Sequence, residues 1–184
     1  SMFKTCSIRE MIMEDLPMVL AWRNHPDIRR FMFNQHVIEM DEHRNWFEKT
    51  LNDPTRRLLI VEDRNEPFGY VQFSNVVSGG VSDWGFYVRP DAPKGNGRKL
   101  GITALNYAFS ILDLHKVCGQ AIANNKASIS FHLRLGFAEE GMLREHHCNN
   151  GEYHSLICFG LLKYEWQPSL NFQESIDDKN SNCW

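Results

Sequence analysis

The stretch FYVRPDAPKGNGRKL, residues 86–100, decides how this chain is expected to fold. Its first residues are apolar and aromatic, as in a strand, and two prolines follow. Gly95 and Gly97 then open a segment in which apolar positions from Leu100 to Ile111 repeat at helical spacing. The stretch therefore predicts a strand, a glycine loop and a helix in direct succession.

The glycine loop has the features of a phosphate site. Glycines let a ligand approach the backbone closely, and the free N–H groups at the start of a helix point outward with the positive end of the helix dipole. Lys94, Arg98 and Lys99 add positive charge. Neither the Walker loop nor the GxGxxG dinucleotide fingerprint is present. The alternative interpretation is a tight turn with solvated basic side chains.

Outward from this stretch, the pattern predicts a single mixed α/β (α+β) domain over residues 1–166. The predicted strands span residues 3–8, 58–61, 68–73, 81–88, 115–122, 137–143 and 153–162. The predicted helices span residues 16–24, a segment capped by Asp41, the apolar repeat at 100–111, and residues 126–135, which end at Gly136. Residues 167–184 are polar and lack periodicity, so we expect a loose tail there.

Composition and charge argue against several classes of protein. Of the 184 residues, 42% are hydrophobic and 23% are charged, as in ordinary soluble globular proteins. Lys and Arg number 20 against 23 Asp and Glu, a net charge of −3 that argues against a nucleic-acid binder. We expect neither a membrane span nor a signal peptide, because no suitable apolar run is present. The five cysteines form no CxxC pair, so we expect reduced thiols and a cytoplasmic location.

Motifs beyond the glycine loop extend the pattern. Asn125 precedes the last predicted helix, His132 lies within that helix, and Gly136-Phe137 follow its end. This order resembles the GNAT superfamily of acetyl-CoA-dependent N-acetyltransferases, whose loop reads Arg/Gln-x-x-Gly-x-Gly/Ala and whose next helix carries Asn and usually Tyr before Gly-Phe. The resemblance covers roughly residues 3–166. It implies a mostly antiparallel sheet of about seven strands, flanked by helices and splayed between the fourth and fifth strands.

The resemblance also implies how acetyl-CoA would be held. Backbone N–H groups of the loop would bind the CoA pyrophosphate, and the end of the fourth strand would pair with the pantetheine arm. Asn125 would bind the arm as well, although it is also a good helix cap. The residues implied for the acetyl-CoA site are Tyr87, Val88, Lys94, Gly95, Asn96, Gly97, Arg98, Lys99, Asn125 and Ser128. No metal is implied.

Two positions depart from the family pattern. Ala92 stands where the family's loop has Arg or Gln, which removes one side-chain contact. His132 stands where the family usually has a Tyr that is proposed to protonate the leaving CoA thiolate. Histidine can donate a proton near neutral pH, so His132 is a candidate catalytic acid. The alternatives are packing beside the thioester or an ordinary helix histidine.

Acetyl transfer needs a neutral amine, and therefore a group that takes its proton. Asp83 is the best-placed candidate, because it lies within a predicted apolar strand two residues before Gly85. The alternative is an exposed or salt-bridged strand residue. His25, at the end of the first predicted helix, is a second candidate base or substrate ligand. His146, His147 and His154 show no convincing metal-ligand spacing.

The first third of the chain is expected to choose the acceptor amine. The stretch from Trp22 to Met32 is similar to one branch of the GNAT superfamily. That branch includes ribosomal-protein N-terminal acetyltransferases and the pseudaminic-acid pathway enzyme, which acts on a UDP-linked 4-amino-4,6-dideoxy sugar for flagellin glycosylation. Arginines there could meet a diphosphate, and aromatic rings could cover a base or a deoxysugar. The alternatives are a solvated helix end and core packing. The candidate acceptor residues are Arg23, Asn24, His25, Arg29, Phe31, Phe33 and Trp46.

Two other functions stay open at this point. Asp27, Glu39, Asp41 and Glu42 would suit a peptide N-terminus or a polyamine such as spermidine. The departures from the family pattern would also suit a non-catalytic acetyl-CoA-binding module. We expect a small-molecule amine as the partner, with no nucleic acid or membrane. The resemblance also implies that two copies can pair as a homodimer through edge strands.

Overall fold

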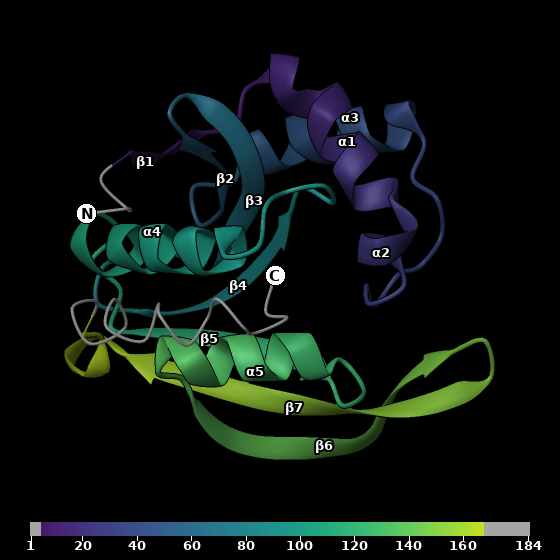
Figure 1. The fold of residues 1–184 in the computed structure, drawn as a ribbon, viewed down its shortest axis with the longest axis vertical. Coiled ribbons are helices and arrows are strands. Elements are labelled where there is room, and N and C mark those ends of the chain that lie inside the picture. Colours follow the sequence, from purple (N-terminus) through teal and green to yellow (C-terminus); the bar gives the residue numbers. More distant parts are fainter. Residues whose placement is uncertain (1–4, 168–184) are drawn as a thin grey trace.

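A central sheet carries the fold in the computed structural model, which describes residues 5–167 (Figure 1). Within that part of the chain the sheet has seven strands in the order β1-β2-β3-β4-β5-β7-β6. The strands are β1 (Cys6–Glu10), β2 (Arg57–Asp63), β3 (Glu66–Ser74), β4 (Val81–Val88), β5 (Lys116–Ile122), β6 (Ala138–Asn149) and β7 (Glu152–Leu162). Neighbours are antiparallel except β4 and β5, which are parallel. The predicted fold class is therefore confirmed.

The helices follow the predicted order, with one addition. They are α1 (Leu16–Asn24), α2 (Pro26–Arg29), α3 (Met40–Leu51), α4 (Asn96–Ser110) and α5 (Lys126–Leu135). The short α2 was not predicted, and α3 takes Glu39 rather than Asp41 as its N-cap. None of the helices within residues 5–167 combines the length and the apolarity needed to cross a bilayer. The predicted start of the first strand at Phe3 and the tail from residue 168 lie outside the described residues.

The two faces of the sheet bury separate apolar cores. Leu100 of α4, Phe131 of α5 and Trp84 of β4 belong to one core, and α4 and α5 lie over that face (Figure 1). Trp22 of α1 and Phe47 of α3 belong to the other core, together with tyrosines of β3 and β4. Because side chains alternate along a strand, β4 contributes to both cores.

Strands β4 and β5 separate partway along their length. They pair only at Val81 with Lys116, Ser82 with Val117, and Asp83 with Cys118. Beyond these positions β4 continues to pair with β3, and β5 continues to pair with β7. The backbone of β4 after Asp83 therefore borders an opening in the sheet, as the predicted splay requires.

Candidate active site

The glycine loop opens α4 in the way a phosphate site needs. Gly95 is the N-cap, with a φ of 92°, and a Cβ there would meet nothing within 4 Å. The positive φ suits glycine, and the open space leaves the backbone accessible. The Asn96 N–H donates to the Pro93 carbonyl at 3.2 Å, and the N–H groups that follow, beginning with Gly97, lie at the positive end of the helix dipole. The loop therefore fits a pyrophosphate.

The basic side chains of the loop do not act together. The Lys99 ammonium forms an ion pair with Asp63 of β2, with 3.0 Å between Nζ and Oδ2. The Lys99 side chain, which was expected at the cofactor, is thereby held at the C-terminal end of β2. Arg98 is buried, whereas Lys94 is exposed. Backbone groups and Lys94 are left as the main positive groups at the loop surface.

The second half of β4 offers backbone rather than side chains to the opening. Tyr87 and Val88 are buried, and the Tyr87 ring stacks on Tyr70 with 4.8 Å between centroids. Burial raises the pKa of both tyrosines, so their hydroxyls stay protonated. The side chains of Tyr87 and Val88 are thus core residues, and any role at the cofactor belongs to their main chain.

Asn125 is the N-cap of α5. Its Oδ1 accepts a hydrogen bond from the Ser128 backbone N–H at 3.2 Å, as expected of a capping residue. Both residues are buried, and they lie at the end of β5 that has separated from β4. Asn125 therefore stands beside the opening, where a contact with the pantetheine arm remains a proposal.

His132 is held at both ring nitrogens. Its Nδ1 lies 2.8 Å from the Ser128 carbonyl oxygen, and its Nε2 lies 3.1 Å from Nε1 of Trp84. Because an indole N–H can only donate, Nε2 must accept and the single ring proton is on Nδ1. Burial lowers the pKa of His132 to about 4. A neutral ring with both nitrogens engaged does not suit the expected proton donor, so we do not retain that role.

Asp83 lies at the last paired position of β4, immediately before the opening. It is exposed on the face opposite to Trp84, and Asn75 Nδ2 donates to its Oδ2 at 3.2 Å. The carboxylate is therefore accessible at the place where β4 and β5 part. Its role as a base is a proposal that the exposed position allows.

Sequence reasoning missed Gln72 on β3. It pairs with Gly85 of β4, and a Cβ on Gly85 would lie 3.2 Å from Gln72 Nε2. The Tyr70 hydroxyl donates to Gln72 Oε1 at 2.8 Å, which directs the amide. The available signal was Gly85 itself, because a glycine inside a strand often marks a close approach.

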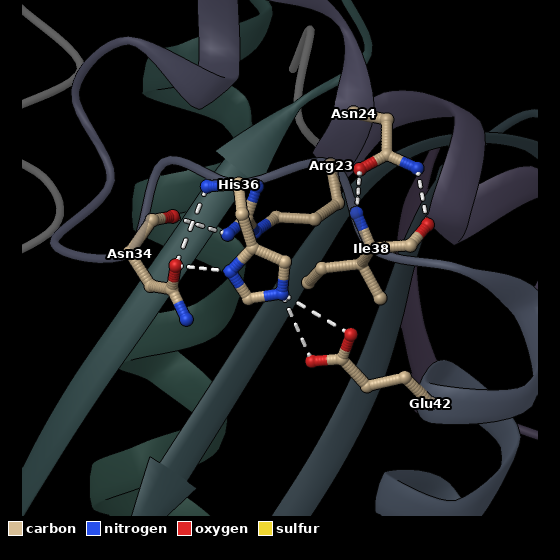
Figure 2. Close-up of polar contacts among 6 residues, drawn as sticks. All are labelled: Arg23, Asn24, Asn34, His36, Ile38 and Glu42. Atoms are coloured by element: carbon tan, nitrogen blue, oxygen red, sulfur yellow. Dashed lines mark hydrogen bonds and ion pairs between the residues drawn. The ribbon is translucent and has the colours of Figure 1, made fainter.

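Polar tethers hold the loop between α2 and α3 against α1 (Figure 2). The Asn24 amide donates to the Ile38 carbonyl at 2.8 Å and accepts from the Ile38 N–H at 2.9 Å. Arg23 is 6% exposed, and its Nη2 donates to the Asn34 carbonyl at 2.5 Å. Burial lowers the Arg23 pKa. These two side chains, expected at the substrate, instead fix this loop.

His36 closes the same loop onto α3. Its Nε2 lies 3.1 Å from each carboxylate oxygen of Glu42, and its Nδ1 faces the Asn34 side-chain oxygen (Figure 2). Both neighbours carry acceptor oxygens, and the contact with Glu42 is exposed. Such a pair orients the loop while adding little stability.

A cavity of about 690 Å³ lies between α2, the following loop and the turn that joins β6 to β7. Its volume is in the usual range for small-molecule sites. Its lining residues are Pro26, Asp27, Arg29, Arg30, Phe33, Asn34, Gln35, His36, Asn149 and Asn150. Arg29 and Phe33, two of the residues expected at the acceptor, therefore line one cavity, and its use for the acceptor is a proposal.

Three other expected acceptor residues do not line this cavity. His25 is the N-cap of α2, and its Nδ1 accepts from the Asp27 N–H at 3.1 Å. Phe31 lies beneath the Arg30 guanidinium, and Trp46 stacks on His43 beside the α1–α3 core. The core interpretation therefore holds for Trp46.

The late histidines do not form a metal centre. Among residues 5–167, no group of three or more His, Cys, Asp or Glu side chains is arranged to hold an ion. His147 contacts the Phe33 ring edge-on, with 5.3 Å between ring centroids. This contact joins β6 to the loop beside the cavity.

Comparison with known proteins adds a family to this geometry. The family model described as an acetyltransferase (GNAT) domain matches residues 7–138. The chain belongs to the GNAT acetyltransferase family. The match includes the glycine loop, the opening between β4 and β5, and the whole of α5.

Relatives of this GNAT acetyltransferase carry different names. It is 25% identical over 136 residues to the acetyltransferase PseH of Campylobacter jejuni, covering 74% of this chain and 85% of the relative. It is 27% identical over 150 residues to the spermidine N(1)-acetyltransferase of Vibrio cholerae, covering 80% and 87%. A crystal structure of spermidine N-acetyltransferase from Vibrio cholerae, in complex with CoA and spermine, superposes with a TM-score of 0.81 at 26% identity, covering 88% of this chain and 97% of that one.

Proposed function

We propose that this GNAT acetyltransferase acetylates the amine of a small molecule that carries phosphate, specifically the 4-amino group of a UDP-linked 4-amino-4,6-dideoxy sugar in pseudaminic-acid biosynthesis for flagellin glycosylation. The observation that carries the proposal is the charge of the cavity. Arg29 and Arg30 line it, and Asp27 is the one acidic residue among its lining residues. Guanidinium groups bind diphosphates through paired hydrogen bonds, whereas they repel a polyamine.

The relatives support the chemistry but divide on the acceptor. The similarity to PseH agrees with an amino-sugar substrate, and the similarity to spermidine acetyltransferases favours a polyamine. Phe33 adds an apolar surface to the cavity, which a uracil ring or a sugar methyl group can cover. Spermidine offers neither a phosphate for the arginines nor a ring for the phenylalanine.

Acetyl-CoA is the acetyl donor, and the protein groups near the opening fit its parts. The first turn of α4 and Lys94 would bind the pyrophosphate through backbone N–H groups and charge. The backbone of β4 beyond its pairing with β5 and the Asn125 amide would bind the pantetheine arm. The bound thioester supplies an activated acetyl group beside the last residues of β4. The substrate amine would reach it from the exposed face on which Asp83 lies.

Asp83 is the proposed base of the reaction. Its carboxylate takes a proton from the ammonium group, directly or through water, so that the nitrogen lone pair can attack the acetyl carbon. The new N–C bond forms as the C–S bond breaks, and the sulfur leaves as a thiolate. Because the one ring proton of His132, on Nδ1, is donated to the Ser128 carbonyl, the thiolate takes its proton from solvent.

The test is a thiol-release assay with acetyl-CoA and three acceptors: the UDP-4-amino-4,6-dideoxy sugar, spermidine and a ribosomal N-terminal peptide. We expect turnover with the sugar. Turnover only with spermidine or the peptide would reject the proposed acceptor. Measurable acetyl-CoA binding with no turnover on any of the three would reject the proposed acceptor as well, and would favour a non-catalytic module.

Charge at the cavity is tested by Arg29→Gln, with Arg44→Gln as the matched control. Arg44 is an exposed arginine of α3 that does not line the cavity. Loss of one charged hydrogen bond to phosphate should raise the KM for the UDP sugar by ~10–100-fold. The control should leave the KM unchanged. Equal KM values in Arg29→Gln and the wild type would show that the diphosphate binds elsewhere.

A further inference from the structure

The opening between β4 and β5 is bridged by side chains where backbone pairing stops. Asp83 and Cys118 form the last backbone pair, and the next residues along the two strands are Trp84 and Gly119. The Trp84 Nε1–H donates to His132 Nε2 at 3.1 Å, and this bond is buried. Trp84 belongs to β4, and His132 to α5, which follows β5 in the chain. One hydrogen bond therefore connects the two sides of the opening.

Gly119 makes room for this bond. A Cβ on Gly119 would lie 2.5 Å from His132 Nε2 and 2.7 Å from Trp84 Nε1. Real Cβ atoms do not come this close to other heavy atoms, so any larger residue would push the two rings apart. Trp84, Gly119 and His132 thus form one interdependent set.

Ring packing holds both partners rigidly. His132 stacks on Phe159 of β7 with 4.7 Å between centroids and an interplanar angle of 7°. Trp84 stacks on Phe137 at 5.3 Å and contacts Phe86 of β4 at 4.8 Å. The exposed fractions are 7% for Trp84 and 1% for His132. Because neither ring can move without disturbing a packed core, the hydrogen bond ties β4 to β7 as well as to α5.

We propose that the Trp84–His132 hydrogen bond, formed over Gly119, sets the separation of β4 and β5 for the acyl-CoA arm, and that His132 is a positioning residue rather than a proton donor. The inference rests on the proposed function only in placing the arm in this opening. The positioning role also explains how a histidine can occupy the position at which the family usually has a tyrosine. The His132 ring uses Nε2 to accept a hydrogen bond from the Trp84 indole N–H.

The first experiment compares Gly119→Ala with Gly141→Ala by calorimetric titration of acetyl-CoA. Gly141 is the matched control, because it lies on β6 and a Cβ there would meet nothing within 4 Å. We expect Gly119→Ala to weaken acetyl-CoA binding by ~10-fold or more, the cost of about one hydrogen bond. The control should bind as the wild type does. If Gly119→Ala does not fold, Trp84→Phe takes its place in the titration, because this variant removes the indole N–H donor and the part of the ring that carries it. We expect the same weakening of acetyl-CoA binding.

The second experiment separates positioning from proton donation at His132. His132→Gln keeps an acceptor oxygen for the indole N–H but cannot serve as an acid, whereas His132→Phe keeps only the bulk. We expect the KM for acetyl-CoA to rise in His132→Phe and to recover substantially in His132→Gln. The alkaline side of the kcat profile should be the same in all three proteins.

Three results decide the matter. If Gly119→Ala and Trp84→Phe are folded and bind acetyl-CoA as the wild type does, the positioning role is rejected. If both His132 variants lose kcat by 10²–10⁴-fold at unchanged acetyl-CoA affinity, His132 is a proton donor and the proposal is overturned. If the wild type binds no acetyl-CoA, the proposed function itself fails, which the same titration shows separately.

Discussion

The proposed donor side and the proposed acceptor side of the site are built by different means. On the donor side, Trp84, Phe131, His132 and Phe137 pack as a cluster of buried rings beneath the sheet. On the acceptor side, the loop between α2 and α3 is exposed and is attached by a few hydrogen bonds, chief among them those of Asn24. The donor side is therefore set by packing, and the acceptor side by polar tethers.

This difference bears on how one fold serves several acceptors. A packed ring cluster has one arrangement, and a change of a single methylene group in it is felt. Polar tethers on a surface loop can be replaced without disturbing a core. A constant donor site with a variable acceptor site agrees with relatives that share this fold yet are named for different activities.

The largest expected effect comes from Asp83, the proposed base at the last paired position of β4 and β5. Asp83→Asn keeps the shape of the side chain and removes the proposed base, so kcat should fall by ~10²–10⁴-fold. Asp41→Asn is the matched control, because Asp41 is an exposed residue of the first turn of α3. Steady-state assays at saturating acetyl-CoA measure both variants.

Affinity for acetyl-CoA should be the same in Asp83→Asn and in the wild type, because the residue is not proposed to hold the cofactor. A loss of less than about tenfold in kcat would show that water or another group takes the amine proton. The proton acceptor would then lie away from β4.

A smaller effect is expected from acid, and it should arise on the donor side. His132 has a pKa of about 4 in the folded chain, below the ordinary histidine value of 6.5. Above pH 6.5 the ring is neutral in both states and pH has no effect. As pH falls from 6.5 towards 4 the unfolded chain takes up a proton that the folded chain refuses, so the free energy of unfolding should fall by ~3 kcal/mol.

Urea unfolding at pH 7 and at pH 4.5 measures this loss. His132→Gln should remove most of it, while His115→Gln, at an exposed histidine, should retain it. Buried His43, whose pKa is also lowered, adds a loss of the same sign that remains in both variants. An unchanged pH dependence in His132→Gln would show that another group, and not His132, takes up the proton that destabilises the folded chain in acid.

The sequence predicts the donor side better than the acceptor side for a physical reason. The glycine loop and the Asn125 cap are local features, read from residues a few positions apart, and both are present. The environment of His132 depends on Trp84, 48 positions away, and that of Lys99 on Asp63, 36 positions away. Such pairings arise only when the sheet is assembled.

The acceptor loop shows the same limit in another form. Arg23 and Asn24 have the residue types of a substrate site, and the sequence gives no sign that their polar groups would be used by the chain itself. Arg29 and Phe33 have similar types but face the cavity. Arg29 belongs to the short helix α2, whose four residues have too little periodicity to be predicted, so the sequence does not show which of these side chains face the cavity.

The smallest expected effect tests the tethers. Asn24→Ala removes two hydrogen bonds to Ile38 and should lower the free energy of unfolding by ~1–2 kcal/mol. Asn52→Ala is the control, because Asn52 caps the end of α3 with one long bond at 3.3 Å. Because the loop also lines the cavity, Asn24→Ala should raise the KM for the acceptor severalfold while leaving the affinity for acetyl-CoA unchanged. An equal loss of acetyl-CoA affinity would mean that the proposed donor and acceptor sides are coupled. The loop between α2 and α3 would then help to set the donor site as well.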